Sequence, residues 1–302
     1  MVFTSFEELC AAAKEHAACS RVVVAAADDA HTLEAVKRVA GEGIVRPVLT
    51  GDPEAIKAVL AEVGLEVPEE DIHAADDAPA AAAKAVELVR AGEADFIMKG
   101  RLDTSDILRA VVNKEHGLSR GRTMSHVAIN QVPAYHKLLV TTDGGMLLAP
   151  TLEQKRDIVL NAVEMLRSLG YDEPKVGVLA AAEKVNPKSV DSTDAAELKR
   201  MWEAGEIEGC LLEGPISFDL ACVPERAVTK RYESPCAGDC DVLVVPNITA
   251  GNILGKSLVE MAGAKMAGLV VGAACPIVVT SRGSSSEEKY NALCIAASMT
   301  AK

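Results

Sequence analysis

The segment Thr280–Glu288 carries the densest set of side chains that could bind an anion. It reads Thr-Ser-Arg-Gly-Ser-Ser-Ser-Glu-Glu, follows an apolar stretch that predicts a strand, and opens the last predicted helix. Hydroxyls, a guanidinium and the free N–H groups of a helix start together suit a phosphate or another oxyanion. Ser285 and Glu288 also have the spacing of a capping box, so the Glu288 carboxylate is either a chemical group or a helix cap.

Two other strand ends place cations where an anion could bind. Lys99 directly follows a predicted strand and precedes Gly100, which permits close backbone approach. In the segment Val245–Lys256, Asn252 and Lys256 lie about one helical turn apart, after another strand. A plain turn with a solvated lysine is the alternative for this second segment.

A basic island, Arg120-Gly-Arg122-Thr-Met-Ser125, interrupts an acidic chain. Its cations could pair with phosphates or with neighbouring acids. Glu213 and Asp219 flank a Gly-Pro pair, where a structural turn is at least as good an interpretation as a carboxylate site.

Composition excludes several classes of partner. The 302 residues contain 31 Lys and Arg against 44 Asp and Glu, a formal charge of −13, and only 3% aromatic residues. Nucleic acids and anionic membranes both require a positive surface, so neither is an expected partner, and an anionic substrate must rely on a few local cations. The eight cysteines form no C-x-x-C pair, and no bound metal is expected.

Targeting signals and common catalytic motifs are also missing from the sequence. The N-terminus has acids where a signal peptide needs a basic end, so we expect a reducing cytoplasm. The longest apolar run, within 267–279, is broken by Pro276. No H-E-x-x-H, G-x-S-x-G or G-x-G-x-x-G occurs, and Gly251 to Ser257 lacks the spacing of a Walker loop.

Short β-branched runs alternate with segments of helical period, which predicts an α/β fold with a parallel sheet covered by helices. The predicted strands are Arg21–Ala26, Val45–Leu49, Phe96–Met98, His126–Gln131, Lys137–Thr141, Lys175–Leu179, Asp241–Val245 and Pro276–Thr280. The predicted helices are His31–Ala40, Pro53–Val63, Pro79–Ala91, Thr104–Lys114, Leu152–Ser168, Asp194–Ala204, Ala250–Met261 and Ser285–Ser298. A domain boundary is suggested near 140–151, but the pattern leaves open which domain holds the last strand and helix.

Taken in order, segments between about 95 and 300 resemble the phosphate acetyltransferase and phosphate butyryltransferase family. The resemblance rests on an ordered set of motifs: Met98–Gly100, Thr104–Val111, Thr142–Gly145, Pro150–Lys155, Glu213–Asp219, Ser234–Gly238, Val245–Asn247, Ala250–Ile253 and Ser281–Arg282. The single-unit length and the Met-Lys-Gly and Gly-Pro-Ile-Ser variants are more similar to the butyryl branch. This resemblance implies reversible transfer of a short acyl group between coenzyme A and inorganic phosphate. Coenzyme A would be a substrate, with no permanently bound cofactor and no metal.

The resemblance also implies a fold similar to that of the isocitrate and isopropylmalate dehydrogenases, with two three-layer αβα domains and a cleft between them. The final strand and helix would then return to the first domain. Domain one would be 1–138 plus 272–302, and domain two 139–271. A homodimer or higher homo-oligomer is expected.

Carried onto this sequence, the family's active-site pair falls on Ser281 and Arg282. The resemblance implies that Arg282 neutralises phosphate and the developing oxyanion, while Ser281 hydrogen-bonds the thiol or carbonyl oxygen. The family's general base is an Asp, and Glu288 occupies the matching position with one more methylene. Lys99 would assist Arg282.

Coenzyme A is expected to be held by a second group of polar residues. Arg120 and Arg122, with Ser125 nearby, are the candidates for its phosphates, and Asn252 and Lys256 are further binding candidates. Three other functions stay open: a phosphate acetyltransferase using acetyl-CoA, a metal-dependent dehydrogenase of the same fold, and a coenzyme A-binding relative without turnover. No cluster of aspartates on one helix face supports the dehydrogenase.

Overall fold

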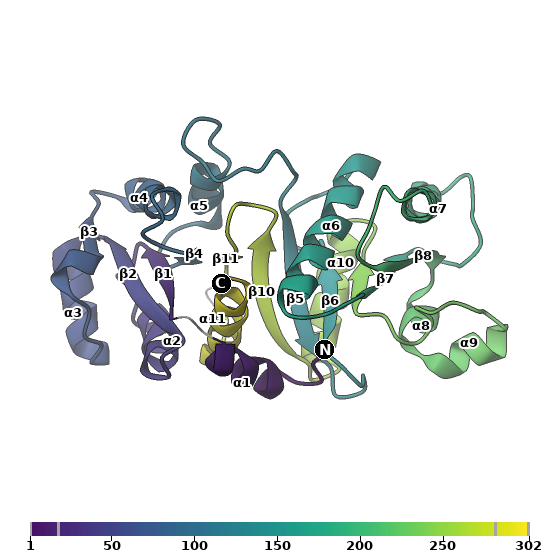
Figure 1. Ribbon diagram of the computed structural model, residues 1–302, viewed down its shortest axis with the longest axis horizontal. Coiled ribbons are helices and arrows are strands. Elements are labelled where there is room, and N and C mark those ends of the chain that lie inside the picture. The colour runs from purple at the N-terminus through teal and green to yellow at the C-terminus, as the bar shows by residue number, and fades with distance from the viewer. Residues whose placement is uncertain (1, 17–18, 281–282, 301–302) are drawn as a thin grey trace. The chain divides into compact units, whose positions relative to one another are not determined.

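The computed structural model describes residues 2–16, 19–280 and 283–300 (Figure 1). Its contacts divide the chain into two compact units. The terminal unit comprises Glu7–Arg122 and Ala267–Lys302, and the central unit comprises Met1–Phe6 and Thr123–Met266. The predicted domain limits, 1–138 plus 272–302 and 139–271, stay a prediction.

The terminal unit is a sheet with the strand order β3-β2-β1-β4-β11-β10, parallel except where β11 meets β10. Its strands are β1 Ser20–Ala25, β2 Val45–Gly51, β3 Ile72–Ala74, β4 Phe96–Lys99, β11 Ile277–Val278 and most of β10 Lys265–Val271. Its helices are α1 Phe6–His16, α2 Ala30–Gly41, α3 Pro53–Val63, the 3₁₀ turn η1 Glu69–Asp71, α4 Ala78–Arg90, α5 Thr104–Val111 and α11 Ser286–Thr300. Helices α4 and α5 lie on one side of β1, β2 and β4, and α2 and α11 lie on the other (Figure 1).

Local sequence explains these elements. Val22, Val23 and Val24 are fully buried in β1, as expected for a strand covered on both faces. Helix α3 begins after Asp52, whose side chain accepts a hydrogen bond from the N–H of Glu54, and ends at Gly64 in the left-handed conformation. The α/β class predicted from the sequence is confirmed.

The central unit has the strand order β5-β6-β9-β7-β8, with only β5 and β6 antiparallel. Its strands are β5 Ser125–Gln131, β6 Leu139–Thr142, β7 Lys175–Leu179, β8 Leu211–Ile216 and β9 Val242–Val244. Its helices are α6 Leu152–Ser168, α7 Val190–Glu203, α8 Phe218–Cys222, α9 Pro224–Lys230 and α10 Ile248–Glu260. In Figure 1, α7 lies on one side of β7 and β8, and α8 and α9 lie on the other.

Three strands and three α-helices were not expected from the sequence. The segment interpreted as a turn around Gly214 and Pro215 is strand β8, at one end of the strand order, where a proline costs no ladder hydrogen bond on the outer side. The apolar run within 267–279 forms parts of β10 and β11. Strand β3 and helices α1, α8 and α9 were also missed. Within the described residues, no helix is long and apolar enough to cross a membrane.

A cluster of ion pairs joins the segments that precede β6 and β9 to the first residue of β7 in the central unit. Lys137 Nζ lies 2.7 Å from Asp241 Oδ1 and 2.9 Å from Asp239 Oδ1, and Lys175 Nζ also bonds Asp239. Burial favours the neutral form of Asp239, but hydrogen bonds from Lys175, Lys137 and His136 outweigh it and hold the pKa of Asp239 well below its usual range. Lys137 and Asp241 are 5% and 3% exposed, so each depends on the other for neutralisation.

We predict that Lys137→Met lowers the free energy of unfolding by about 3–5 kcal/mol, because it leaves the buried Asp241 carboxylate without its cation. Urea unfolding measures this change. The exposed Lys188→Met is the control and is expected to change stability by less than about 0.5 kcal/mol. Equal effects of the two substitutions would contradict the importance assigned to the cluster.

Candidate active site

A pocket of about 630 Å³ opens in the terminal unit beside the carboxyl ends of β1 and β4, the edge where open α/β sheets bind ligands. Its lining combines two buried lysines, two buried threonines and several acids: Asp29, His31, Thr32, Ala78, Lys99, Gly100, Arg101, Leu102, Asp103, Asp106, Thr280 and Lys289. The sequence singled out only Lys99 of the two lysines.

Lys99 is the last residue of β4 and is 8% exposed. Its Nζ donates a 3.3 Å hydrogen bond to the carbonyl of Gly100. The strand end is held tightly, because a Cβ at Gly100 would lie 2.2 Å from the carbonyl oxygen of Ala26. Only glycine permits this approach. The backbone therefore fixes Lys99 at the pocket.

Glu288 lies in the first turn of α11 and is partly buried. The Glu288 N–H donates to Ser285 Oγ at 3.1 Å, so Ser285 caps the helix. The carboxylate accepts a 2.7 Å hydrogen bond from Ser284 Oγ. Burial raises the pKa of Glu288, outweighing the opposing hydrogen bond from Ser284 and the charge of Lys289. Of the capping box, the hydrogen bond from the Glu288 N–H to Ser285 is present. The Glu288 carboxylate accepts its hydrogen bond from Ser284 instead.

Contacts with α2 hold the first turn of α11 in place. The Arg38 guanidinium lies 3.6 Å from the centroid of the Tyr290 ring, and its Nη1 lies 2.8 Å from Glu287 Oε2. The Tyr290 hydroxyl donates a 2.6 Å hydrogen bond to Glu42 Oε2. A cation over an aromatic face and two charged hydrogen bonds together restrict the turn that carries Glu288.

The other predicted site residues are distributed over both units. Ser281 and Arg282 lie outside the described residues. In the terminal unit, the exposed Arg120 donates from Nη2 to the carbonyl of Ala274 at 3.3 Å, and Arg122 is partly exposed. Ser125 is fully buried in the central unit. Its Oγ accepts a 3.0 Å hydrogen bond from Asn161.

Asn252 and Lys256 are exposed on α10 of the central unit, four residues apart and therefore on one helix face. The first turn of this helix contacts the segment 142–145, because Gly144 and Gly251 meet through their backbones. A Cβ on Gly251 would lie 2.6 Å from Gly144 Cα. The structure thus brings together two motifs that lie more than a hundred residues apart in the sequence. The binding roles assigned to the predicted site residues stay predictions.

Lys289 is the buried cation of the pocket that the sequence analysis did not identify. It directly follows Glu288, and the capping-box spacing of Ser285 and Glu288 indicates a role only for the Glu288 carboxylate. One signal was available: a cation in the first turn of a helix opposes the helix dipole and is therefore unfavourable. Its burial depends on contacts that the sequence does not show.

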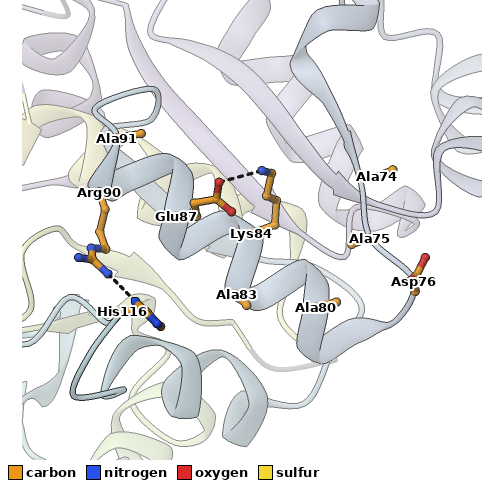
Figure 2. A pocket seen from close by; sticks show the side chains of 10 residues that line it. All are labelled: Ala74, Ala75, Asp76, Ala80, Ala83, Lys84, Glu87, Arg90, Ala91 and His116. Carbon is orange, nitrogen blue, oxygen red and sulfur yellow. Dashed lines mark hydrogen bonds and ion pairs between the residues drawn. The ribbon is translucent and has the colours of Figure 1, made fainter.

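A second pocket, of about 820 Å³, lies along α4 of the terminal unit and is lined largely by alanines (Figure 2). Both of its cations already have partners within the terminal unit. Lys84 Nζ lies 3.0 Å from Glu87 Oε1, and Arg90 bonds the carbonyl of Glu115 and approaches His116 Nδ1 at 3.4 Å. The smaller pocket, with its two buried lysines, is therefore the better candidate for an anionic substrate.

Comparison with known proteins identifies the family. The family model described as "Phosphate acetyl/butaryl transferase" matches residues 73–297. The chain is 40% identical over 277 residues to the phosphate butyryltransferase of Clostridium acetobutylicum, covering 92% of both chains. It is also 40% identical over 279 residues to the phosphate acetyltransferase of Thermotoga maritima, covering 92% of this chain and 94% of the relative.

A solved structure gives the same result. The branched-chain phosphotransacylase from Enterococcus faecalis V583 matches with a TM-score of 0.80 and 34% identity, covering 93% of this chain and 99% of that chain. The chain belongs to the phosphate acetyltransferase and phosphate butyryltransferase family, which confirms the resemblance seen in its motifs.

We predict that Gly251→Ala destabilises the protein by about 1–3 kcal/mol, because the added methyl would collide with the backbone of Gly144. Gly255→Ala in the same helix is the matched control, since a Cβ there meets nothing within 4 Å. We expect the control to stabilise the helix by about 0.5–1 kcal/mol. Thermal unfolding of both variants measures the difference. An unchanged Tm in Gly251→Ala would show that stability does not depend on the close contact between Gly144 and Gly251.

Proposed function

We propose that this protein reversibly transfers a short acyl group, with butyryl as the expected group, between coenzyme A and inorganic phosphate. Family membership and the pocket with two buried lysines beside the first turn of α11 support this proposal. Coenzyme A enters as a substrate, and no permanently bound cofactor is part of the proposal.

In the proposed reaction, Glu288 accepts the thiol proton of coenzyme A. The thiolate attacks the carbonyl carbon of the acyl phosphate, a C–S bond forms, and the C–O bond to phosphate breaks. The phosphate leaves against Arg282 and Lys99, while Ser281 hydrogen-bonds the thiol or carbonyl oxygen. In the reverse direction a phosphate oxygen attacks the thioester, the thiolate leaves, and Glu288 returns the proton.

The raised pKa of Glu288 suits a general base for a thiol. An ordinary thiol has a pKa of about 8.5, and proton transfer becomes easier as the pKa of the base approaches that of the acid. Nearby cations favour the thiolate as well. The acyl group passes directly between the two substrates, so no side chain of the protein becomes acylated.

The butyryl preference rests on the motif variants Met98–Gly100 and Gly214–Ser217. The relatives include a phosphate butyryltransferase and a phosphate acetyltransferase at equal identity, so acetyl is the alternative acyl group. For the phosphates of coenzyme A we propose Arg120 and Arg122 with Ser125, and for other parts of the substrate the exposed Asn252 and Lys256. A cytoplasmic homo-oligomer remains our expectation.

We predict phosphate-dependent release of free thiol when the purified protein is incubated with butyryl-CoA and phosphate without added metal. A chromogenic disulfide follows the thiol, and comparison of kcat/KM for acetyl-, propionyl- and butyryl-CoA gives the chain-length preference. We expect the highest value with butyryl-CoA. A higher value with acetyl-CoA would replace the butyryl assignment. Failure to release thiol from all three would leave a coenzyme A-binding protein without turnover.

Glu288→Gln is predicted to lower kcat by about 10²–10⁴-fold, the usual contribution of a general base. In the direction from acyl phosphate and coenzyme A, kcat of the unmodified protein should rise with pH through an apparent pKa above the ordinary glutamate range, because the carboxylate must be deprotonated to accept the thiol proton and burial raises its pKa. A pH–rate profile of both proteins measures this. Near-normal activity of the variant would remove Glu288 as the base.

Stability provides a control for the same substitution. A carboxyl with a raised folded-state pKa contributes stability below its unfolded pKa, and this contribution is lost as pH rises through the folded pKa. As pH rises from acidic to neutral, the free energy of unfolding of the unmodified protein should therefore fall relative to that of Glu288→Gln, and urea unfolding at several pH values measures this. If Glu288→Gln stays folded but loses activity, the loss is due to the missing general base.

A further inference from the structure

Lys289 is a buried cation in the first turn of α11, where a positive charge is unfavourable. Its side chain lines the 630 Å³ pocket, yet the residue is only 5% exposed. Among the described residues, its Nζ has neither a hydrogen bond nor an ion pair within 4 Å. The buried Lys137 of the central unit, by contrast, contacts two carboxylates.

Two physical terms oppose a positive charge at this position. Removing an ammonium group from water costs several kcal/mol unless a counter-charge compensates. Lys289 also lies in the first turn of a 15-residue helix, where the aligned peptide dipoles favour negative charge. An anion in the pocket would reduce both costs at once.

The surroundings of Lys289 match a phosphate. Lys99 lines the same pocket and is 8% exposed, and the Thr280 side chain lines it at 6% exposure. Acids are present too, but two of them are already engaged: Asp106 lies 3.0 Å from Arg109 Nη1, and Asp29 accepts from the Thr32 hydroxyl. Asp103 is exposed. The buried polar side chains of the pocket are thus cations and hydroxyls, while the carboxylates lie nearer the solvent.

We propose that Lys289 and Lys99 together bind the reacting phosphate, which is inorganic phosphate in one direction and the phosphoryl group of the acyl phosphate in the other. This inference rests on the proposed function and adds a binding residue to it. The phosphates of coenzyme A share the same chemistry and are the alternative occupant. We assign the pocket to the reacting phosphate because Lys289 and Glu288, the proposed base, lie in the same turn of α11 and their charges interact.

Equilibrium binding tests the site without requiring turnover. Inorganic phosphate is titrated into the purified protein at constant ionic strength, with chloride as the matched anion, and followed by calorimetry. Lys289→Met is expected to raise the Kd for phosphate about tenfold to a hundredfold, the range expected for a lost charged hydrogen bond. Lys84→Met, which removes a partly exposed cation from the other pocket, is expected to leave the Kd unchanged.

Thermal unfolding gives a second readout of the same variants. Phosphate should raise the Tm of the unmodified protein, because a ligand that binds only the folded state stabilises it. Lys289→Met should lose this increase, and its Tm without phosphate should equal or exceed that of the unmodified protein, because the substitution removes a buried charge that has no ion-pair partner within 4 Å among the described residues. Lys289→Arg keeps the charge and should retain part of the phosphate response. It also replaces the Met variant if that variant does not fold.

Kinetics separates the two occupants. A raised KM for phosphate with an unchanged KM for butyryl-CoA in Lys289→Met supports the proposal. A raised KM for butyryl-CoA alone would overturn it in favour of the phosphates of coenzyme A. Unchanged phosphate binding in a folded Lys289→Met would also overturn it, whatever the activity. Phosphate binding that depends on Lys289 in a protein without acyl transfer would instead refute the proposed function and leave the phosphate site intact.

Discussion

Burial of the C-terminal helix is the constraint on which the terminal unit depends. Every residue of α11 from Lys289 to Ala297 is buried, so the helix cannot shift without exposing core surface. Arg38, Glu42 and Tyr290 then fix its first turn against α2. A helix held in this way presents Glu288 and Lys289 in defined positions, which the proposed proton transfer and anion binding both require.

The two units use buried charge in opposite ways. In the central unit, Lys137 is neutralised by Asp239 and Asp241 and contributes to the structure. In the terminal unit, Lys289 is equally buried but has no ion-pair partner among the described residues, so its charge is available to a ligand. Burying a charge without an ion-pair partner lowers stability, and functional sites are where proteins tolerate that loss.

Elements with strong local signals were predictable. Helix α6 has the predicted bounds Leu152–Ser168, because Thr151 and Gln154 form a full capping box and the apolar period is long. Strand β3 has only three residues, and the Gly-Pro pair within β8 has the composition of a turn, so local pattern could not identify either. Both strands are set by pairing with distant neighbours.

The site was partly predictable for the same reason. The end of a strand predicts the position of Lys99, which lines the pocket, whereas the role of Glu288 stays a prediction. Lys289 could not be identified in this way, because the sequence does not show that its side chain is buried. The hydrogen bond from Asn161 to Ser125 joins residues 36 positions apart, beyond any local pattern.

The central claim is that the acyl group passes directly between coenzyme A and phosphate. Identifying the product tests this claim most directly. Phosphorus-31 NMR of the purified protein with butyryl-CoA and inorganic phosphate should show an acyl phosphate resonance that grows in equal amount with free thiol. It should disappear when excess coenzyme A is added. Thiol release without acyl phosphate would mean that water, not phosphate, accepts the acyl group, and would contradict this account.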